Sequence, residues 1–144
     1  MQVFDVLKQN SQIFGKKIIE ASAGTGKTFA IEHLIVRLLL EKENPLTIDQ
    51  ILVVTFTKAA TKELRFRIRG TLQKALLFLK KRLKEESIFS YLIPFIEKED
   101  KISKLQNAID LFETAQIFTI HSFCFKALKE FAFEADILLD IDED

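Results

Sequence analysis

The sequence is short of several residue types, and each shortage excludes a class of protein. Cys124 is the only cysteine among 144 residues, so an internal disulfide cannot form. With only two histidines beside it, the chain has too few ligands for a usual zinc site. No apolar run reaches the roughly 18 residues that a membrane span needs, and residues 1–12 do not have the pattern of a signal peptide. These shortages together favour a reducing, cytoplasmic setting.

The residues that are present predict one globular domain with a hydrophobic core. Of the chain, 48% is hydrophobic and 29% is charged, a balance typical of folded proteins rather than disordered ones. Fourteen phenylalanines carry the aromatic content, with one tyrosine and no tryptophan, and we expect most of these rings in the core. We also expect Cys124 to be buried as a small hydrophobic residue.

Charge is distributed unevenly, although the formal net charge is zero, from 21 basic and 21 acidic residues. Between Lys58 and Lys84 there are ten lysines or arginines and one acid, Glu63. Between Glu134 and Asp144 there are six acids and no base. A basic middle suits the phosphate backbone of a nucleic acid, whereas an acidic end does not.

The hydrophobic pattern predicts strands and helices that alternate along the chain. Residues 51–56 form a continuous apolar, β-branched run, which is typical of a buried parallel strand. Residues 47–50 have the pattern of a capping box that starts a short helical turn. Further strands are expected at 17–21 and 116–120, and helices at 27–41, 58–85, 89–97, 102–112 and 121–131. This alternation predicts an α/β fold with parallel strands, in which ligands bind outside the carboxyl ends of the strands.

Residues 21–28 have the sequence of a phosphate-binding loop, Ala21-Ser22-Ala23-Gly24-Thr25-Gly26-Lys27-Thr28. They lie between a predicted strand and a predicted helix, the context that this motif needs. Gly24 and Gly26 allow close backbone approach to phosphate oxygens, and the N–H groups at the helix start face the anion. Lys27 is placed to reach the β- and γ-phosphates, and Thr28 to ligate Mg²⁺. A dinucleotide site is disfavoured because the third glycine of that pattern is missing.

A second stretch, Thr55-Phe56-Thr57, opens the basic helix. Its two threonines and the free N–H groups of the helix start can hydrogen-bond a phosphate. Phe56 can stack on a base or pack in the core. The basic residues that share one face of the helix are Lys62, Arg65 and Arg69. Charge alone favours a simpler interpretation, a solvated helix face with Thr57 as its cap.

A third stretch, residues 118–124, ends the last predicted strand and contains His121, Ser122 and Cys124. A hydrolase, a thiol protease or a metal site would each use two of these residues. All three are disfavoured, because neighbours at a helix start do not point at one another and no third orienting group is evident. A histidine and a serine that donate to a ligand at the strand end are the plainer interpretation.

Together the three stretches resemble the RecB family, the beta chain of exodeoxyribonuclease V, within the UvrD/Rep-like superfamily 1 DNA helicases. The matching residues are 19–28, 51–65 and 118–124, in the family's order. The phosphate loop alone indicates only a P-loop NTPase, whereas the Thr-Phe-Thr and Thr-Ile-His-Ser sequences indicate the helicase family. The resemblance extends from about residue 14 to the C-terminus and is weakest between 83 and 115.

The resemblance implies a partial RecA-like P-loop NTPase domain with parallel strands in residues 1–131. It also implies a helical insertion at about 84–115 and the acidic start of an incomplete following subdomain at 132–144. ATP and Mg²⁺ are the implied cofactors, held by residues 21–28, with Lys27 and Thr28 as the catalytic residues and Thr28 as the Mg²⁺ ligand. The implied contacts to DNA, as a single strand or a duplex end, are Thr55, Phe56, Thr57, Lys62, Arg65, His121 and Ser122.

For the parent protein, the resemblance implies an ATP-dependent helicase and exonuclease subunit in recombinational double-strand-break repair. Its partners would be RecC-like and RecD-like subunits, with no membrane involved. Lys58 stands where relatives often carry an acid or a neutral polar residue, and Gln9 and Gln12 are only candidates for reading adenine.

The chain also departs from the family pattern. The acidic D-E-x-x-D-type motif, the second RecA-like domain and the nuclease are not found in it, so we expect an N-terminal piece with negligible ATPase activity. An incomplete sheet leaves an open edge, so we also expect self-association. Two alternatives stay open. One is a P-loop kinase for a small molecule, and the other is a non-catalytic remnant that binds DNA or a partner.

Overall fold

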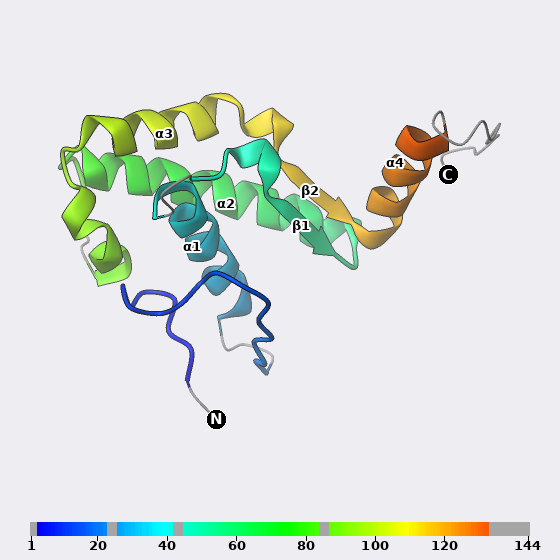
Figure 1. Ribbon diagram of the computed structural model, residues 1–144, viewed down its shortest axis with the longest axis horizontal. Helices are drawn as coiled ribbons and strands as arrows, with labels where there is room; N and C mark the ends of the chain where they lie inside the picture. The colour runs from blue at the N-terminus through cyan, green and yellow to red at the C-terminus, as the bar shows by residue number, and fades with distance from the viewer. Residues whose placement is uncertain (1–2, 23–25, 42–44, 84–86, 133–144) are drawn as a thin grey trace.

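The computed structural model describes residues 3–22, 26–41, 45–83 and 87–132. The elements, in chain order, are α1 (Lys27–Leu40), the 3₁₀ helix η1 (Ile48–Gln50), β1 (Leu52–Thr55), α2 (Lys58–Leu79), η2 (Ser87–Phe95), α3 (Glu99–Asp110), η3 (Phe112–Thr114), β2 (Gln116–Thr119) and α4 (Ile120–Ala132). Figure 1 shows α1, α2 and α3 lying together, β1 and β2 beside them, and α4 beyond the strands.

The sheet consists, within the described residues, of β1 and β2, which pair in parallel. Leu52 lies opposite Gln116 and Thr55 opposite Thr119, so the two strands end side by side. The helices between them form the crossover that parallel strands require. The prediction of an α/β fold with parallel pairing is confirmed.

The hydrophobic core lies mainly among α1, α2 and α3. In Figure 1, α3 runs along α2 and α1 crosses in front of α2, and each of the three helices contacts the other two. Each helix contributes one apolar stripe at helical spacing. The core side chains with no exposed surface include Val36 and Leu40 from α1, Ile68, Leu72 and Leu79 from α2, and Leu105 from α3.

Two predicted helix starts are confirmed by hydrogen bonds. The Thr57 hydroxyl accepts from the Ala60 N–H at 3.1 Å and so caps α2. The Thr47 N–H donates to Gln50 Oε1 at 3.0 Å, the backward bond of a capping box. The strand predicted at 116–120 and the helix predicted at 121–131 are β2 and α4, within one residue at each end.

The strand predicted at 17–21 is wrong for this structure, since β1 and β2 account for all strands among the described residues. A strand exists only where its N–H and C=O groups pair with a neighbour. Ile18 is 93% exposed and Ile19 46% exposed, so this apolar run is extended but not packed on the sheet.

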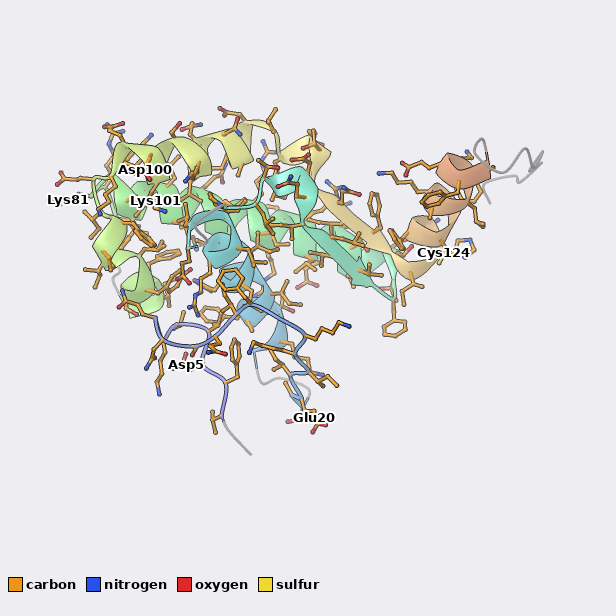
Figure 2. The ribbon with its side chains drawn as sticks, viewed as in Figure 1. Asp5, Glu20, Lys81, Asp100, Lys101 and Cys124 are labelled. Atoms are coloured by element: carbon orange, nitrogen blue, oxygen red, sulfur yellow. The ribbon has the colours of Figure 1, made fainter. Side chains whose placement is uncertain are left out.

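The strand predicted at 51–56 is confirmed as β1, but the prediction that it is buried is wrong. Leu52 is 45% exposed and Val54 40% exposed, because no described element covers their face of β1. The phenylalanines divide in the same way. Phe78, Phe89 and Phe112 are buried, but other rings, Phe56 and Phe66 among them, are largely exposed. Cys124 is exposed on α4 (Figure 2), so its predicted burial is wrong too.

The helix predicted at 58–85 ends early, at Leu79. Lys81 has a left-handed φ of 54°, and the Arg82 N–H donates back to the Leu77 carbonyl at 2.8 Å. This is the bond pattern by which a left-handed residue stops a helix. The next predicted helix, 89–97, is instead the 3₁₀ segment η2, in which Pro94 has no N–H to donate.

The helix predicted at 102–112 is α3, which begins three residues earlier, at Glu99. Glu99 and Asp100 lie in its first turn, where the helix dipole favours acidic side chains. No helix in the described part of the chain is long and apolar enough to cross a membrane.

Candidate nucleotide site and nucleic-acid interface

The N-terminus of α1 carries the described end of the predicted phosphate loop. Gly26 is the residue before the helix and has a left-handed backbone, with φ 84° and ψ 27°. An L-residue with a side chain rarely adopts this conformation, which accounts for glycine at this position. Lys27 and Thr28 follow as the first two helical residues. Ala21 and Ser22 are described on the other side of the loop, whereas Ala23, Gly24 and Thr25 lie outside the described residues.

The electrostatics at this helix start suit an anion. Gly26 offers no side-chain cap, and the first turn of α1 contains no acidic residue. The first N–H groups of a helix have no partner within it, and the helix dipole is positive there. The Lys27 side chain is exposed at the same end. These features together can hold a phosphate group.

The carboxyl ends of β1 and β2 form one rim that holds the second and third predicted stretches. Because Thr55 and Thr119 are register partners, the residues that follow them, Phe56 and Ile120, leave the sheet side by side. Figure 1 shows both arrows pointing toward this rim, with α4 leaving from it. The structure thus brings together the stretches at 55–57 and 119–122. It does not bring the phosphate loop to that rim through a third strand, because residues 17–21 are not in the sheet.

Hydroxyl groups on the β1 side of the rim hydrogen-bond one another. Thr55 Oγ1 lies 2.6 Å from Thr61 Oγ1 and donates to the Thr57 carbonyl at 3.2 Å. The Thr57 hydroxyl caps α2. Phe56 lies between them with 89% of its surface exposed, so of the two predicted roles, packing in the core is excluded in this structure. The threonines fix the turn, and the ring projects from it.

The β2 side of the rim has a similar polar turn. Thr119, which is 7% exposed, accepts from the Ser122 N–H at 3.0 Å and donates to Ser122 Oγ at 2.9 Å. His121 is exposed beside this turn. Within the described residues, no group of three or more histidine, cysteine, aspartate or glutamate side chains could hold a metal ion. His121 and Ser122 therefore offer hydrogen-bond donors on the same rim as Phe56.

The basic residues predicted to share one face of α2 differ in their surroundings. Lys62 is exposed. Arg65 donates through Nη2 to the Ala115 carbonyl at 2.9 Å, tying α2 to the start of β2. Arg69 Nη1 lies 3.6 Å from Glu113 Oε1, and the guanidinium carbon of Arg69 lies 5.8 Å from the centre of the Phe112 ring. Lys62 is thus the residue of this set best placed to meet a ligand, and Arg65 and Arg69 stabilise the fold.

Three buried polar residues on α1, which the sequence patterns did not single out, organise its inner face. Glu32 accepts from Arg67 Nε at 2.6 Å and from Thr71 Oγ1 at 2.8 Å, and so links α1 to α2. His33 and Arg37 are each 1% exposed. The signal for Arg37 was in the sequence: a lone arginine inside the apolar run 34–40, with Glu41 four residues later.

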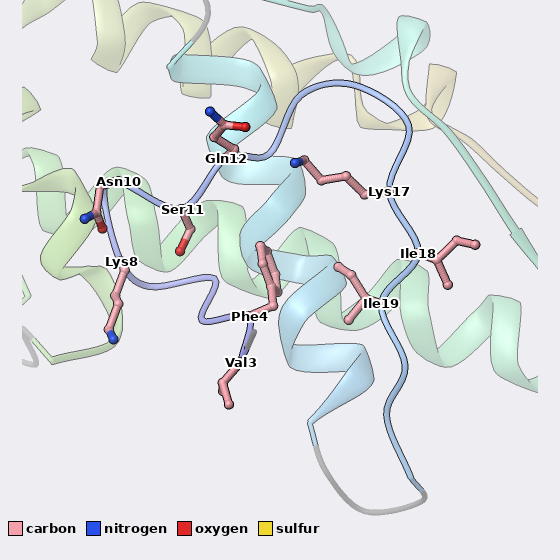
Figure 3. Close-up of a pocket in the computed structure, with 9 residues that line it drawn as sticks. All are labelled: Val3, Phe4, Lys8, Asn10, Ser11, Gln12, Lys17, Ile18 and Ile19. Atoms are coloured by element: carbon pink, nitrogen blue, oxygen red, sulfur yellow. The ribbon is translucent and has the colours of Figure 1, made fainter. Parts of the chain in front are cut away.

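A cavity of about 730 Å³ lies at the surface between the N-terminal segment, residues 3–12, and the extended residues 17–19. Figure 3 shows these two stretches on either side of α1. The side chains that line the cavity mix apolar groups, such as Phe4 and Ile19, with polar ones, such as Asn10 and Gln12. Residues 17–19 lead directly into the predicted phosphate loop. The cavity therefore adjoins the candidate phosphate site along the chain.

Comparison with known proteins identifies relatives over nearly the whole chain. Residues 6–143 match a family described as UvrD/REP helicase N-terminal domain. The chain is 41% identical over 135 residues to RecBCD enzyme subunit RecB of Chlamydia trachomatis, covering 90% of this chain and 13% of that protein. It is 39% identical over 133 residues to the RecB subunit of Escherichia coli, covering 88% of this chain and 11% of that protein. It is 37% identical over 128 residues to the RecB subunit of Mycobacterium tuberculosis, covering 87% of this chain and 12% of that protein. The chain thus spans roughly an eighth of the length of these curated relatives.

Proposed function

Because this chain belongs to the UvrD/REP helicase N-terminal domain family, we propose that it is the ATP-binding N-terminal portion of a RecB-like, ATP-dependent DNA helicase and exonuclease subunit. Residues 1–131 would form part of a RecA-like domain with a helical insertion at about 84–115. Residues 132–144 would begin the next subdomain. The single observation that carries the proposal is the left-handed Gly26 that places Lys27 and Thr28 at the start of α1.

The described end of the phosphate loop, residues 26–28, suits the triphosphate of ATP and its Mg²⁺. The glycine before the helix leaves the first N–H groups uncapped, and no acid stands in the first turn to repel phosphate. Lys27 would neutralise charge on the β- and γ-phosphates, and the Thr28 hydroxyl would ligate the metal ion. Bound Mg·ATP would supply the phosphoryl transfer to water that powers movement along DNA.

Hydrolysis needs more than these groups can provide. A positioned water and further charge stabilisation at the γ-phosphate are required. The described residues contain no acidic cluster suited to a metal ion, and the sequence contains no match to the acidic helicase motif. We therefore propose that these 144 residues bind ATP without turning it over at a measurable rate.

The rim at the ends of β1 and β2 would meet the DNA strand. Thr55, Thr57 and Ser122 form the polar turns of this rim, and the exposed Phe56 ring projects between them as a surface on which a base can stack. His121 and Lys62 add exposed donors for phosphate oxygens. Arg65 supports the rim from behind through Ala115. The substrate would be a single strand or a duplex end.

The whole protein would act in double-strand-break repair with RecC-like and RecD-like subunits. This rests on the RecB relatives, each described as a subunit of the RecBCD enzyme. We place such a subunit in the cytoplasm, where bacterial chromosomal DNA lies.

The test uses the longer protein that contains this chain. Lys27→Ala should lower ATP-dependent unwinding roughly 10²–10³-fold, the usual effect of removing one such electrostatic group. Lys16→Ala, an exposed lysine before the loop, is the matched control and should unwind normally. Near-normal unwinding by the Lys27 variant would refute the assignment.

Two assays of the 144-residue chain separate the alternatives. DNA-stimulated ATP turnover by the purified chain would contradict the incomplete site, and phosphate transfer to a metabolite would indicate a kinase. DNA binding with a steep salt dependence, but without nucleotide affinity, would indicate a non-catalytic remnant.

A further inference from the structure

Arg37 is a buried cation whose hydrogen bonds go to a part of the chain that precedes the phosphate loop. It lies on α1 and is 1% exposed. Its Nη1 donates to the Val6 carbonyl at 3.0 Å, and its Nη2 donates to the carbonyls of Gln9 at 3.2 Å and Ser11 at 3.0 Å. One side chain thus binds three carbonyl groups of residues 6–11.

The rest of the guanidinium is satisfied on α1 and η2. Its Nε donates to both carboxylate oxygens of Glu41, each at 2.9 Å. Its central carbon lies 5.9 Å from the centre of the Tyr91 ring. A buried charge is tolerated only when it is paired and its donors are used, and Arg37 meets both conditions. An apolar residue here would bury surface but could not hold the N-terminal segment.

Apart from Arg37, two apolar side chains attach the N-terminal segment in the described part of the chain. Val6 is buried at 5% exposure, and Leu7 packs against the hydrophobic core. The other side-chain hydrogen bonds of the segment are internal: Leu7 N–H donates to Asp5 Oδ1 at 3.0 Å, and Ser11 Oγ donates to the Asp5 carbonyl at 2.6 Å. These bonds shape the turn but do not join it to α1. Arg37 therefore makes the polar attachment of the segment to α1.

The position of this segment matters because it is one wall of the 730 Å³ cavity, opposite residues 17–19. Figure 3 shows Lys8, Asn10, Ser11 and Gln12 along this wall. Arg37 stands ten residues after Lys27 on the same helix, about 15 Å along its axis at 1.5 Å per residue. One helix therefore carries the candidate phosphate site at its start and the anchor of the cavity wall near its end.

We propose that Arg37 is a positioning residue that holds the N-terminal segment against α1, so that the segment forms the wall that contacts the nucleotide beyond its phosphates. This inference rests on the proposed function. Arg37 itself would not touch the nucleotide. Binding of ATP would depend on it, because a wall held in place does not have to be ordered when the ligand binds. Binding of a ligand that consists of phosphates alone would not.

The experiment measures equilibrium binding of Mg·ATP and of Mg·tripolyphosphate to the 144-residue chain, with Arg37→Met and Arg37→Lys variants. Arg37→Lys keeps a positive charge beside Glu41, but its one ammonium group cannot reach all three carbonyls. This variant therefore tests the proposal even if Arg37→Met does not fold. We expect ATP affinity to fall about ten-fold or more in either variant, and tripolyphosphate affinity to stay within about two-fold. Hydrogen exchange of residues 6–11 should accelerate in parallel.

Thr71→Val is the matched control. It removes a buried hydrogen bond to Glu32 on α1 but leaves Arg37, its pairing with Glu41 and its three carbonyl bonds to residues 6–11 intact. It should keep ATP affinity near the wild-type value and should not accelerate exchange in the segment. An equal loss in Thr71→Val, or an equal loss of tripolyphosphate affinity in the Arg37 variants, would indicate a general loss of structure and overturn the proposal.

The outcomes also distinguish this inference from the proposed function. If wild type binds neither ATP nor tripolyphosphate, the proposed function fails. If wild type binds both and folded Arg37 variants bind ATP equally well, only the positioning role is wrong.

Discussion

We expect the fold to lose stability as the pH falls from 7 toward 4, because His33 must stay neutral inside it. The ring is 1% exposed on α1. Its neighbours are aromatic: the ring centres of Phe29, Phe89 and Tyr91 lie at 4.3, 5.4 and 5.6 Å. Nδ1 lies 2.6 Å from the Tyr91 hydroxyl. This surrounding offers an imidazolium ion no water, and burial lowers the pKa of His33 from 6.5 to about 4.

The sign and size of the effect follow from this pKa. Between about pH 6.5 and 4, the unfolded chain binds a proton at His33 and the folded chain does not, so the free energy of unfolding decreases as the pH falls through that window. Each pH unit across it removes up to about 1.4 kcal/mol. From pH 7 to 4.5, the loss from this one residue is about 2 kcal/mol. Above pH 7 the residue contributes no pH dependence.

The assay is urea unfolding, followed by circular dichroism, at pH 7 and pH 4.5. His33→Gln should be less stable than wild type at pH 7, but it should lose about 2 kcal/mol less than wild type on acidification. Leu72→Ala, at a core site that carries no titratable group, lowers the stability at both pH values and should keep the wild-type pH dependence. If wild type and His33→Gln lose the same stability between the two pH values, the reasoning about His33 is refuted.

Three further predictions concern stability and association. Thr57→Val should lower the free energy of unfolding by about 1 kcal/mol, because the hydroxyl that caps α2 is lost, while Thr57→Ser should change it little. Equal urea midpoints for the two variants would contradict the capping role of Thr57. Leu72→Ala, at a site with no exposed surface, should cost about 2–5 kcal/mol, and Leu77→Ala, 40% exposed on the same helix, should cost clearly less. The purified chain should self-associate through the uncovered apolar face of β1, so a monodisperse monomer in analytical ultracentrifugation would argue against it.

Local signals predicted most of the elements. The helix starts at Lys27 and at Thr57 follow from glycine and threonine chemistry that acts within a few residues, and the structure keeps both. The parallel pairing of β1 with β2 follows from the alternation of strands and helices. Such predictions succeed because the residues that determine where an element begins lie within or next to that element in the sequence.

The failures depend on partners that are distant in the chain. Ile18 and Ile19 have the composition of a strand, but none of the described strands pairs with them. Leu52 and Val54 have the composition of a buried strand, but no described element covers them. The three carbonyl bonds of Arg37 could not be predicted either, because they join residues 26 to 31 positions apart. Sequence patterns report the side chain but not the distant group that it meets.

In the candidate site, too, the motifs predict which residues are involved but not the contacts that these residues make in the fold. Motifs predict the residues of the candidate phosphate loop and of the rim, and the structure places the stretches at Thr55 and Thr119 side by side. The hydrogen bond from Arg65 to the Ala115 carbonyl and the 89% exposure of Phe56 could be found only in the fold.

The central claim is that this chain holds ATP through Lys27 at the start of α1, and calorimetric titration of Mg·ATP into the purified chain tests it most directly. We predict saturable binding by wild type and by Lys16→Ala. Lys27→Ala should weaken it about ten- to a hundred-fold, the range expected when a charged donor to phosphate is removed. Absence of binding by wild type, or unchanged binding by Lys27→Ala, would contradict the account.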